Sequence, residues 1–170
     1  CGAMGMIAIG AGGLDVAVAM ATGTYYLQCP SVVRVNLVGK KAKWASAKDV
    51  ILYILQQLSV KGGVNKIIEY TGEGLKELSL TDRATICNMG AELGATTSVF
   101  PTDEITKEYL IQQGREEDYV ELKADEDATY DEEITVDLSK LVPLTAKPHS
   151  PDAVVPVSEL KGMKINQVVI

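Results

Sequence analysis

The sequence predicts an α/β domain, in which strands and helices alternate along the chain. Segments with β-branched residues at alternate positions, such as VVRVNLVGK, are separated by segments with helical apolar spacing, such as DVILYILQQL. Helix-capping residues precede those helices, and glycines follow them. The 170 residues, 46% apolar and 23% charged, have the composition of an ordinary globular protein. This length suits one domain, or one domain with pieces of its neighbours.

The first 30 residues are rich in Gly and Ala. Gly12 and Gly13 can open a tight turn, after which LDVAVAMA predicts a short, closely packed helix that ends at Gly23. A glycine-rich turn that leads into a helix could also bind a phosphate. No strand with a GxGxxG pattern precedes it, so packing explains these glycines better than nucleotide binding does.

The body of the domain is expected between residues 31 and 148. Its elements are, in order, a strand at 32–40, a helix at 46–58, a strand and turn at 65–74, a helix at 82–94, a short strand at 96–100, a helix at 103–113 and a strand at 132–141. Ser46, with Asp49 three residues later, is close to a capping box. Ser79 or Thr81 is expected to cap the helix at 82–94, and Thr102 the helix at 103–113. The helix at 46–58 has an apolar stripe of Val50, Ile51, Ile54, Leu55 and Leu58.

The two ends of the chain are expected to belong to neighbouring domains. Residues 1–30 are predicted to be the end of a preceding domain, and residues 149–170 a linker followed by the first strand of the next domain. Residues 143–157 hold four of the six prolines, which favours an extended connection. The chain starts with Cys rather than Met and ends with the strand-like NQVVI, so we expect an internal piece of a longer polypeptide.

Charge and cysteine content limit the classes of partner. The net charge is −7, much of it in a solvated loop at 115–133, and no basic patch is present, so no nucleic-acid partner is expected. No run of about 18 apolar residues is free of charge, and no membrane partner is expected either. Three cysteines, Cys1, Cys29 and Cys87, have no metal-ligand spacing, and an odd count argues against a disulfide framework. A reducing cytoplasm or an organelle matrix is therefore the simplest compartment, and a cytoplasmic location is expected.

The segment TICNMGAELGATTSVFP, residues 85–101, is the most informative stretch. It places Asn88 and Glu92 four residues apart, which would put both on one face of a helix. The two side chains could simply face water. Their helical neighbours are small, however, and Gly90 lies between them, which favours close approach by a ligand or another domain.

This segment closely resembles the corresponding part of the aconitases. GMIAIGAGGLDVAVAMATG, VVRVNLVGK with the later WASAKDVILYIL, and SVKGGVNKIIEYTGEG resemble the same family in the same order. The resemblance implies a three-layer α/β/α domain of an iron–sulfur hydro-lyase that interconverts citrate and isocitrate through cis-aconitate, a step of the tricarboxylic acid cycle. It also implies that Asn88 lies near the [4Fe-4S] cluster and the substrate hydroxyl. Glu92 would hydrogen-bond the iron-bound water or hydroxide.

The departures from the family are as informative as the matches. The Asp-Ser-His-Thr element, the Gly-Ser-Cys-Thr-Asn element and the later CxxC pair do not occur in this sequence, and none of the three cysteines matches a cluster ligand. The chain alone is therefore expected to bind no cluster or metal, to be inactive, and to form one wall of the active site. Cys87 is expected to be a small buried thiol. His149 matches no catalytic histidine and is expected to be a surface residue.

The expected partners are a small tricarboxylic or dicarboxylic acid and the remaining aconitase domains, on the same polypeptide or on a small subunit. Within the family, the large subunits of isopropylmalate dehydratase and homoaconitase are the near alternatives. An alternative of another class is a non-catalytic binding or scaffold module of the same fold.

Overall fold

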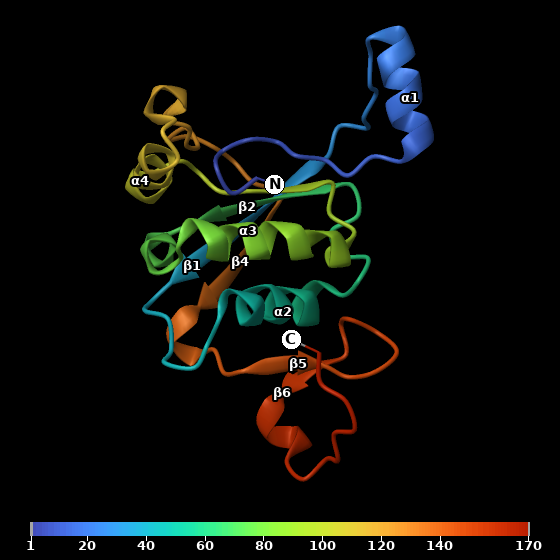
Figure 1. The fold of residues 1–170 in the computed structure, drawn as a ribbon, viewed down its shortest axis with the longest axis vertical. Helices are drawn as coiled ribbons and strands as arrows, with labels where there is room; N and C mark the ends of the chain where they lie inside the picture. Colours follow the sequence, from blue (N-terminus) through green and yellow to red (C-terminus); the bar gives the residue numbers. More distant parts are fainter. Residues whose placement is uncertain (1, 170) are drawn as a thin grey trace.

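The computed structural model describes residues 2–169, and its centre is a four-stranded parallel sheet (Figure 1). The strands lie in the order β3-β2-β1-β4. They are β1 (Ser31–Val38), β2 (Lys66–Thr71), β3 (Thr97–Val99) and β4 (Glu132–Asp137), and the helices are α1 (Gly13–Thr22), α2 (Ala47–Leu58), α3 (Leu80–Met89) and α4 (Glu104–Gln112). Each connection between parallel strands crosses over the sheet, as parallel pairing requires. The α/β class predicted from the alternating segments is confirmed.

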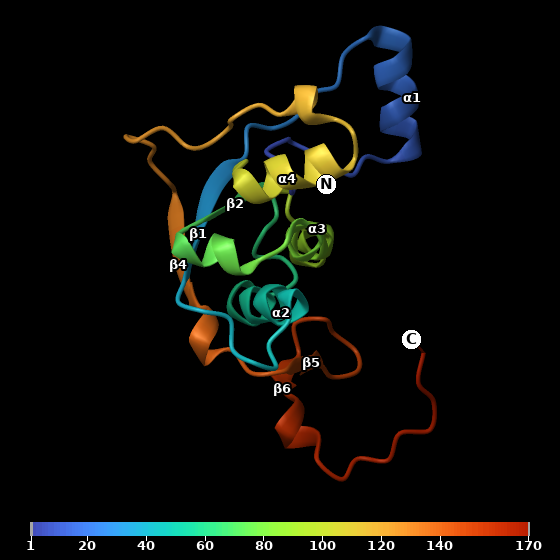
Figure 2. The ribbon, with the colours of Figure 1, turned by 60° about the vertical axis from the view of Figure 1, so that its left-hand side comes forward.

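The core lies between the sheet and the helices α2 and α3, which cover the same face (Figure 2). Alternate residues of β1 and β2 point into it, and the apolar stripe predicted for α2 packs against them. The largest completely buried aliphatic side chains of this core are Leu37, Ile51, Ile54, Leu55, Ile68, Leu78, Ile86, Leu93 and Leu138. Ser46 and Asp49 form the predicted capping box, so the start of α2 is determined locally.

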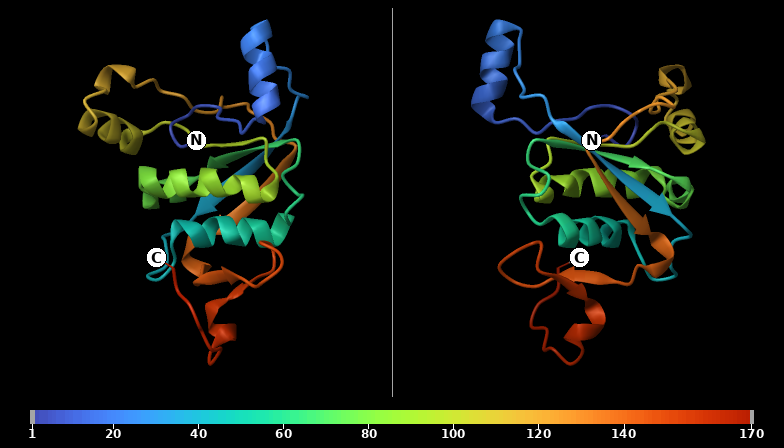
Figure 3. Two further views of the ribbon diagram at one scale, coloured as in Figure 1. Left: turned by 45° about the vertical axis from the view of Figure 1, so that its right-hand side comes forward. Right: turned by 180° about the vertical axis from the view of Figure 1, so that it is seen from behind.

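The opposite face of the sheet is polar and carries no helix within the described residues, as the view from behind shows (Figure 3). Arg34, on the central strand, donates to Thr71 at 2.9 Å and pairs with Glu133 at 3.4 Å. Parallel sheets are normally covered on both faces. The second helical layer implied by the resemblance is therefore not formed by this part of the chain.

The N-terminal segment adds to the edge of the sheet at β3. Gly2 forms a parallel bridge with Val99, and its carbonyl accepts the Phe100 amide at 2.9 Å. The chain then leaves the body of the protein, and α1 projects away from it (Figure 1). None of the residues of α1 is buried, and Leu14 and Met20 are 79% and 82% exposed. The packing expected for Gly12 and Gly13 is not seen here, since a Cβ at Gly13 would meet nothing within 4 Å and one at Gly12 would meet only Asp15 of α1 itself, at 3.3 Å.

One extended segment differs from the prediction. The proline-rich segment at 143–157 is not a free connection. It folds into an antiparallel hairpin of β5 (Leu144–Ala146) and β6 (Val154–Pro156) that packs on α2 and buries Leu144 and Val154. The domain boundary predicted after residue 148 falls inside this hairpin.

The C-terminal segment and the helix caps bring smaller corrections. Residues 165–169 form no strand, while Ile170 and Cys1 lie outside the described residues. The cap of α4 is Asp103, which accepts the Thr106 amide at 3.1 Å. Thr102, expected in that role, instead bonds the chain at residues 120–122. Among residues 2–169, no helix combines the length and the apolar character that crossing a bilayer needs.

Candidate functional site

The helix that carries Asn88 begins at a well-formed cap. Ser79, one of the two predicted caps, accepts the Asp82 amide at 3.2 Å, and the Asp82 carboxylate accepts the Ser79 amide at 3.1 Å. This capping box determines where α3 starts. The expected single helix at 82–94 is in fact two segments, because α3 ends at Met89 and a 3-10 helix follows at Gly90–Leu93. Gly94, with φ of 72°, ends it in the left-handed conformation.

This change of helix type separates Asn88 from Glu92. Residues four apart are rotated by about 40° in an α-helix but by about 120° in a 3-10 helix. Asn88, in the last turn of α3, and Glu92, in the 3-10 helix, consequently line two different pockets. Both residues are exposed, and the spacing expected to put them on one helix face does not place them in one pocket. Within residues 2–169, neither side chain makes a hydrogen bond, whereas Arg83 and Thr85 of the same helix do.

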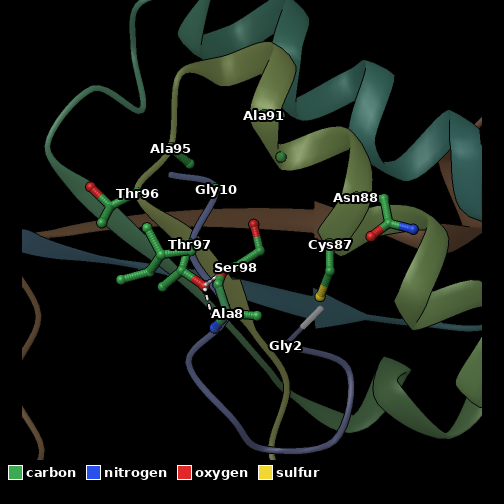
Figure 4. Close-up of a pocket in the computed structure, with 12 residues that line it drawn as sticks. Gly2, Ala8, Gly10, Cys87, Asn88, Ala91, Ala95, Thr96, Thr97 and Ser98 are labelled. Atoms are coloured by element: carbon green, nitrogen blue, oxygen red, sulfur yellow. Dashed lines mark hydrogen bonds between the residues drawn. The ribbon is translucent and has the colours of Figure 1, made fainter. Parts of the chain in front are cut away.

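The first pocket, called the Asn88 pocket below, has a volume of about 270 Å³ and lies between α3, the start of β3 and the N-terminal segment (Figure 4). The N-terminal segment is held there by Thr97, whose Oγ1 donates to the Ala8 carbonyl at 2.8 Å. Cys87 points toward Gly2, and Asn88 lies at the rim (Figure 4). No charged side chain lines this pocket.

Three protonated groups lie together beneath the Asn88 pocket. Burial raises the pKa of the Cys87 thiol to about 12. Burial, and to a lesser extent the nearby Cys87, raise the pKa of Tyr70 well above its usual range. The Tyr70 hydroxyl lies beside Ser98, but neither oxygen makes a well-aligned hydrogen bond with a described residue. Gly90 closes over this group, since a Cβ there would lie 2.3 Å from Ser98 Oγ.

The second pocket, called the Glu92 pocket below, has a volume of about 480 Å³ and lies between α2, the 3-10 helix and the loop that joins β5 to β6. Its charged and ionisable lining residues are Lys48, Glu92, Lys147 and His149, and its apolar lining residues include Leu52, Leu55 and Met89. His149 is exposed, as predicted, but it shares a pocket with Glu92, which was not predicted. The loop could not be placed from the sequence because its position depends on the hairpin packing against α2.

The backbone of His149 is in a conformation that few residues adopt. Its φ is 88°, in the left-handed region, where His is more frequent than most residues but still pays a cost of order 1–3 kcal/mol. Hydrogen bonds on both sides of His149 hold the loop between β5 and β6. The Lys147 amide donates to the Ala153 carbonyl at 2.9 Å, and the Val60 amide donates to the Asp152 carboxylate at 3.1 Å. Ser150 also bonds Asp152, and the two bonds hold the pKa of that carboxyl below its usual range.

A metal cluster does not fit the described residues. Cys29 is exposed on the segment before β1, Cys87 lies on α3, and Cys1 lies outside the described residues. Within residues 2–169, no three side chains of His, Cys, Asp or Glu gather as metal ligands would. A resident iron–sulfur cluster would need cysteines other than these.

Comparison with known proteins gives a consistent result. A model of the aconitase family (aconitate hydratase) matches residues 1–169. The 3-isopropylmalate dehydratase large subunit 2 of Archaeoglobus fulgidus is 44% identical over 99% of this chain and 41% of its own length. The mitochondrial aconitate hydratases of Schizosaccharomyces pombe and Saccharomyces cerevisiae are 46% and 44% identical over 94% and 96% of this chain. These matches cover 21% and 22% of the two relatives, so the chain spans less than half the length of each of these three proteins.

Proposed function

Because the chain belongs to the aconitase family, we propose that it is part of a hydro-lyase that removes water from, and adds it to, a small hydroxy acid. The family match carries this proposal, since it includes the segment with Asn88 and Glu92. The preferred reaction is the interconversion of citrate and isocitrate through cis-aconitate. Identities of 44–46% to proteins named aconitate hydratase support that choice.

The exposed side chains at the end of α3 suit a role as one wall of an active site. Loss of water takes a hydroxyl from one carbon and a proton from its neighbour, so a carboxyl that protonates the departing hydroxyl assists the reaction. We assign this role to Glu92 and assign contact with the substrate hydroxyl to Asn88. A substrate that touches both would lie across the 3-10 helix, with the rest of the active site facing it from other domains. A [4Fe-4S] cluster, if the whole protein holds one, would be bound by cysteines elsewhere.

The test is substitution in the full-length protein, with turnover of citrate and isocitrate as the readout. Glu92→Gln is expected to lower turnover by about two to four orders of magnitude, as loss of an acid–base group commonly does. Glu108→Gln is the matched control, since Glu108 is an exposed glutamate on α4 and lines neither pocket. Asn88→Ala is expected to reduce activity as well. Turnover of Glu92→Gln within about threefold of the control would refute the assigned role.

A second candidate is the large subunit of an isopropylmalate dehydratase. The Archaeoglobus fulgidus protein of that name matches 99% of the chain, and its 44% identity is close to that of the aconitate hydratases. Assaying isopropylmalate beside citrate and isocitrate, with any small subunit supplied, separates the two. A full-length protein that turns over none of these acids would favour the non-catalytic scaffold module.

We further propose that α1 packs against the remaining domains of the same polypeptide. Apart from Asp15 and Thr22, α1 consists of apolar residues and glycine, and such a helix is normally buried, yet α1 has no buried residue here. Hydrogen exchange of residues 13–22 in the full-length protein should be slow, and fast exchange there would refute the packing.

A cytoplasmic location also remains a proposal, supported by the free thiols of Cys29 and Cys87 and testable by fractionation.

A further inference from the structure

We propose that the Glu92 pocket is a carboxylate-binding subsite for the acid substrate, in which Lys48, Lys147 and His149 are the recognition groups. The proposal rests on the hydro-lyase function proposed above and adds to it the residues that would select an acidic substrate on this side of the active site. Glu92 would then act on the hydroxyl of a molecule whose carboxylate is held a few atoms away.

The distribution of charge favours the Glu92 pocket over the Asn88 pocket as a carboxylate-binding site. The chain carries a net charge of −7, which opposes the approach of a di- or tricarboxylate. The Asn88 pocket is lined by no charged side chain. The lining of the Glu92 pocket, by contrast, includes two lysines and a histidine but a single carboxylate, so it is locally positive. Ammonium groups form strong, charge-assisted hydrogen bonds to carboxylates.

The recognition groups come from two elements that are fixed to each other. Lys48 lies in the first turn of α2, whereas Lys147 and His149 lie on the loop between β5 and β6. Two hydrogen bonds join the hairpin of β5 and β6 to α2. Asp49 accepts the buried Leu144 amide at 2.6 Å, and Gln56 donates to the Val154 carbonyl at 3.0 Å. Groups supported in this way keep their positions when a ligand binds, which is what recognition requires.

The strained backbone of His149 is a second, independent observation. A non-glycine residue held with φ of 88° costs free energy, and such residues are concentrated at ligand-binding and active sites. The hydrogen bonds on both sides of His149 hold the loop in this conformation and place the ring among the residues that line the pocket. The volume of about 480 Å³ lies within the usual range for small-molecule sites.

The test uses the full-length enzyme with the acid that it turns over. Lys48→Gln, Lys147→Gln and His149→Asn are each expected to raise KM by about tenfold and to change kcat by less than about threefold, because they remove binding rather than chemistry. Asn tolerates positive φ, and His149→Gly, which removes the ring at no backbone cost, guards against misfolding of the Asn variant. Lys140→Gln is the control, since Lys140 lies outside the pocket and its side chain is 83% exposed.

A KM within about threefold of wild type in all the pocket variants, each with an unchanged melting temperature, would overturn the subsite. If the wild-type protein turns over no acid, the hydro-lyase proposal fails by itself. The subsite is then tested by citrate binding, measured as a shift in melting temperature. Citrate should raise the melting temperature of the wild-type protein but not that of the double variant Lys48→Gln/Lys147→Gln. An equal rise in both, or a rise in neither, would overturn it.

Discussion

Removal of the Asp103 carboxylate should be among the most destabilising single changes in this domain. Arg83 is completely buried on α3, the helix that carries Asn88, and its two terminal nitrogens donate to the two oxygens of Asp103 at 2.9 and 2.5 Å. It also donates to the Leu75 carbonyl at 3.1 Å, and its guanidinium lies over the Phe100 ring. The pair joins α3 to the start of α4.

The expected magnitude follows from the burial of the two partners. Asp103→Ala leaves the Arg83 charge buried without its partner, which typically costs 3–5 kcal/mol. Because the Asp103 side chain is 32% exposed, water screens part of this interaction, and about 3 kcal/mol is the better figure. Loss of the α4 cap adds about 1 kcal/mol. A total of about 4 kcal/mol corresponds to a fall of roughly 8–16 °C in melting temperature for a chain of this size.

The assay is urea and thermal unfolding followed by circular dichroism, with Asp118→Ala as the matched control. Asp118 pairs with Arg115 at 2.6 Å, but both side chains are about half exposed, so its loss should cost less than about 0.5 kcal/mol. An Asp103→Ala variant that loses less than about 1 kcal/mol, or no more than the control, would refute the argument that burial makes the pair important.

The same pair predicts a dependence of stability on pH. Burial raises the pKa of Asp103, but hydrogen bonds and charge from Arg83 outweigh it, so the pKa lies below its usual value. A carboxyl whose pKa is lower in the folded than in the unfolded protein stabilises the folded state at pH values above its pKa in the unfolded chain, about 3.9. This contribution is lost as the pH falls through the pKa in the folded protein. The difference in unfolding free energy between wild type and Asp103→Ala should therefore shrink below about pH 4. A difference that stays constant down to pH 2 would contradict this.

Three further changes test other parts of the structure. Asp49→Ala should cost about 2 kcal/mol in urea unfolding, because it leaves the buried Leu144 amide without an acceptor; a cost below about 0.5 kcal/mol would refute that bond. Iodoacetamide at neutral pH should modify the exposed Cys29 long before Cys87, whose thiolate forms only near pH 12; equal rates by mass spectrometry would contradict the burial of Cys87. Gly72→Ala should destabilise by about 2 kcal/mol or more, since φ is 100° there and a Cβ would lie 2.3 Å from a backbone oxygen of β1; a variant as stable as wild type would refute this.

Features set by neighbouring residues were predictable. The capping boxes at Ser46 and Ser79 each depend on two residues three positions apart, and the stripe of α2 depends on spacing within one helix. The predictions failed where the outcome depends on distant partners. The prolines at 143–157 indicate a linker, yet the segment is held on α2 by residues almost 100 positions away.

For the candidate site, the sequence by itself determined that Asn88 and Glu92 lie four residues apart among small residues, and it indicated the family. Only the tertiary structure decided where they point. Gly90 packs against Ser98 of β3, a 3-10 helix begins there, and the two side chains rotate into separate pockets. The same structure packs the hairpin on α2 and places His149 and Glu92 in the lining of one pocket. Local spacing specifies a helix and its caps, whereas the contacts that orient its end are made by residues far away in the chain.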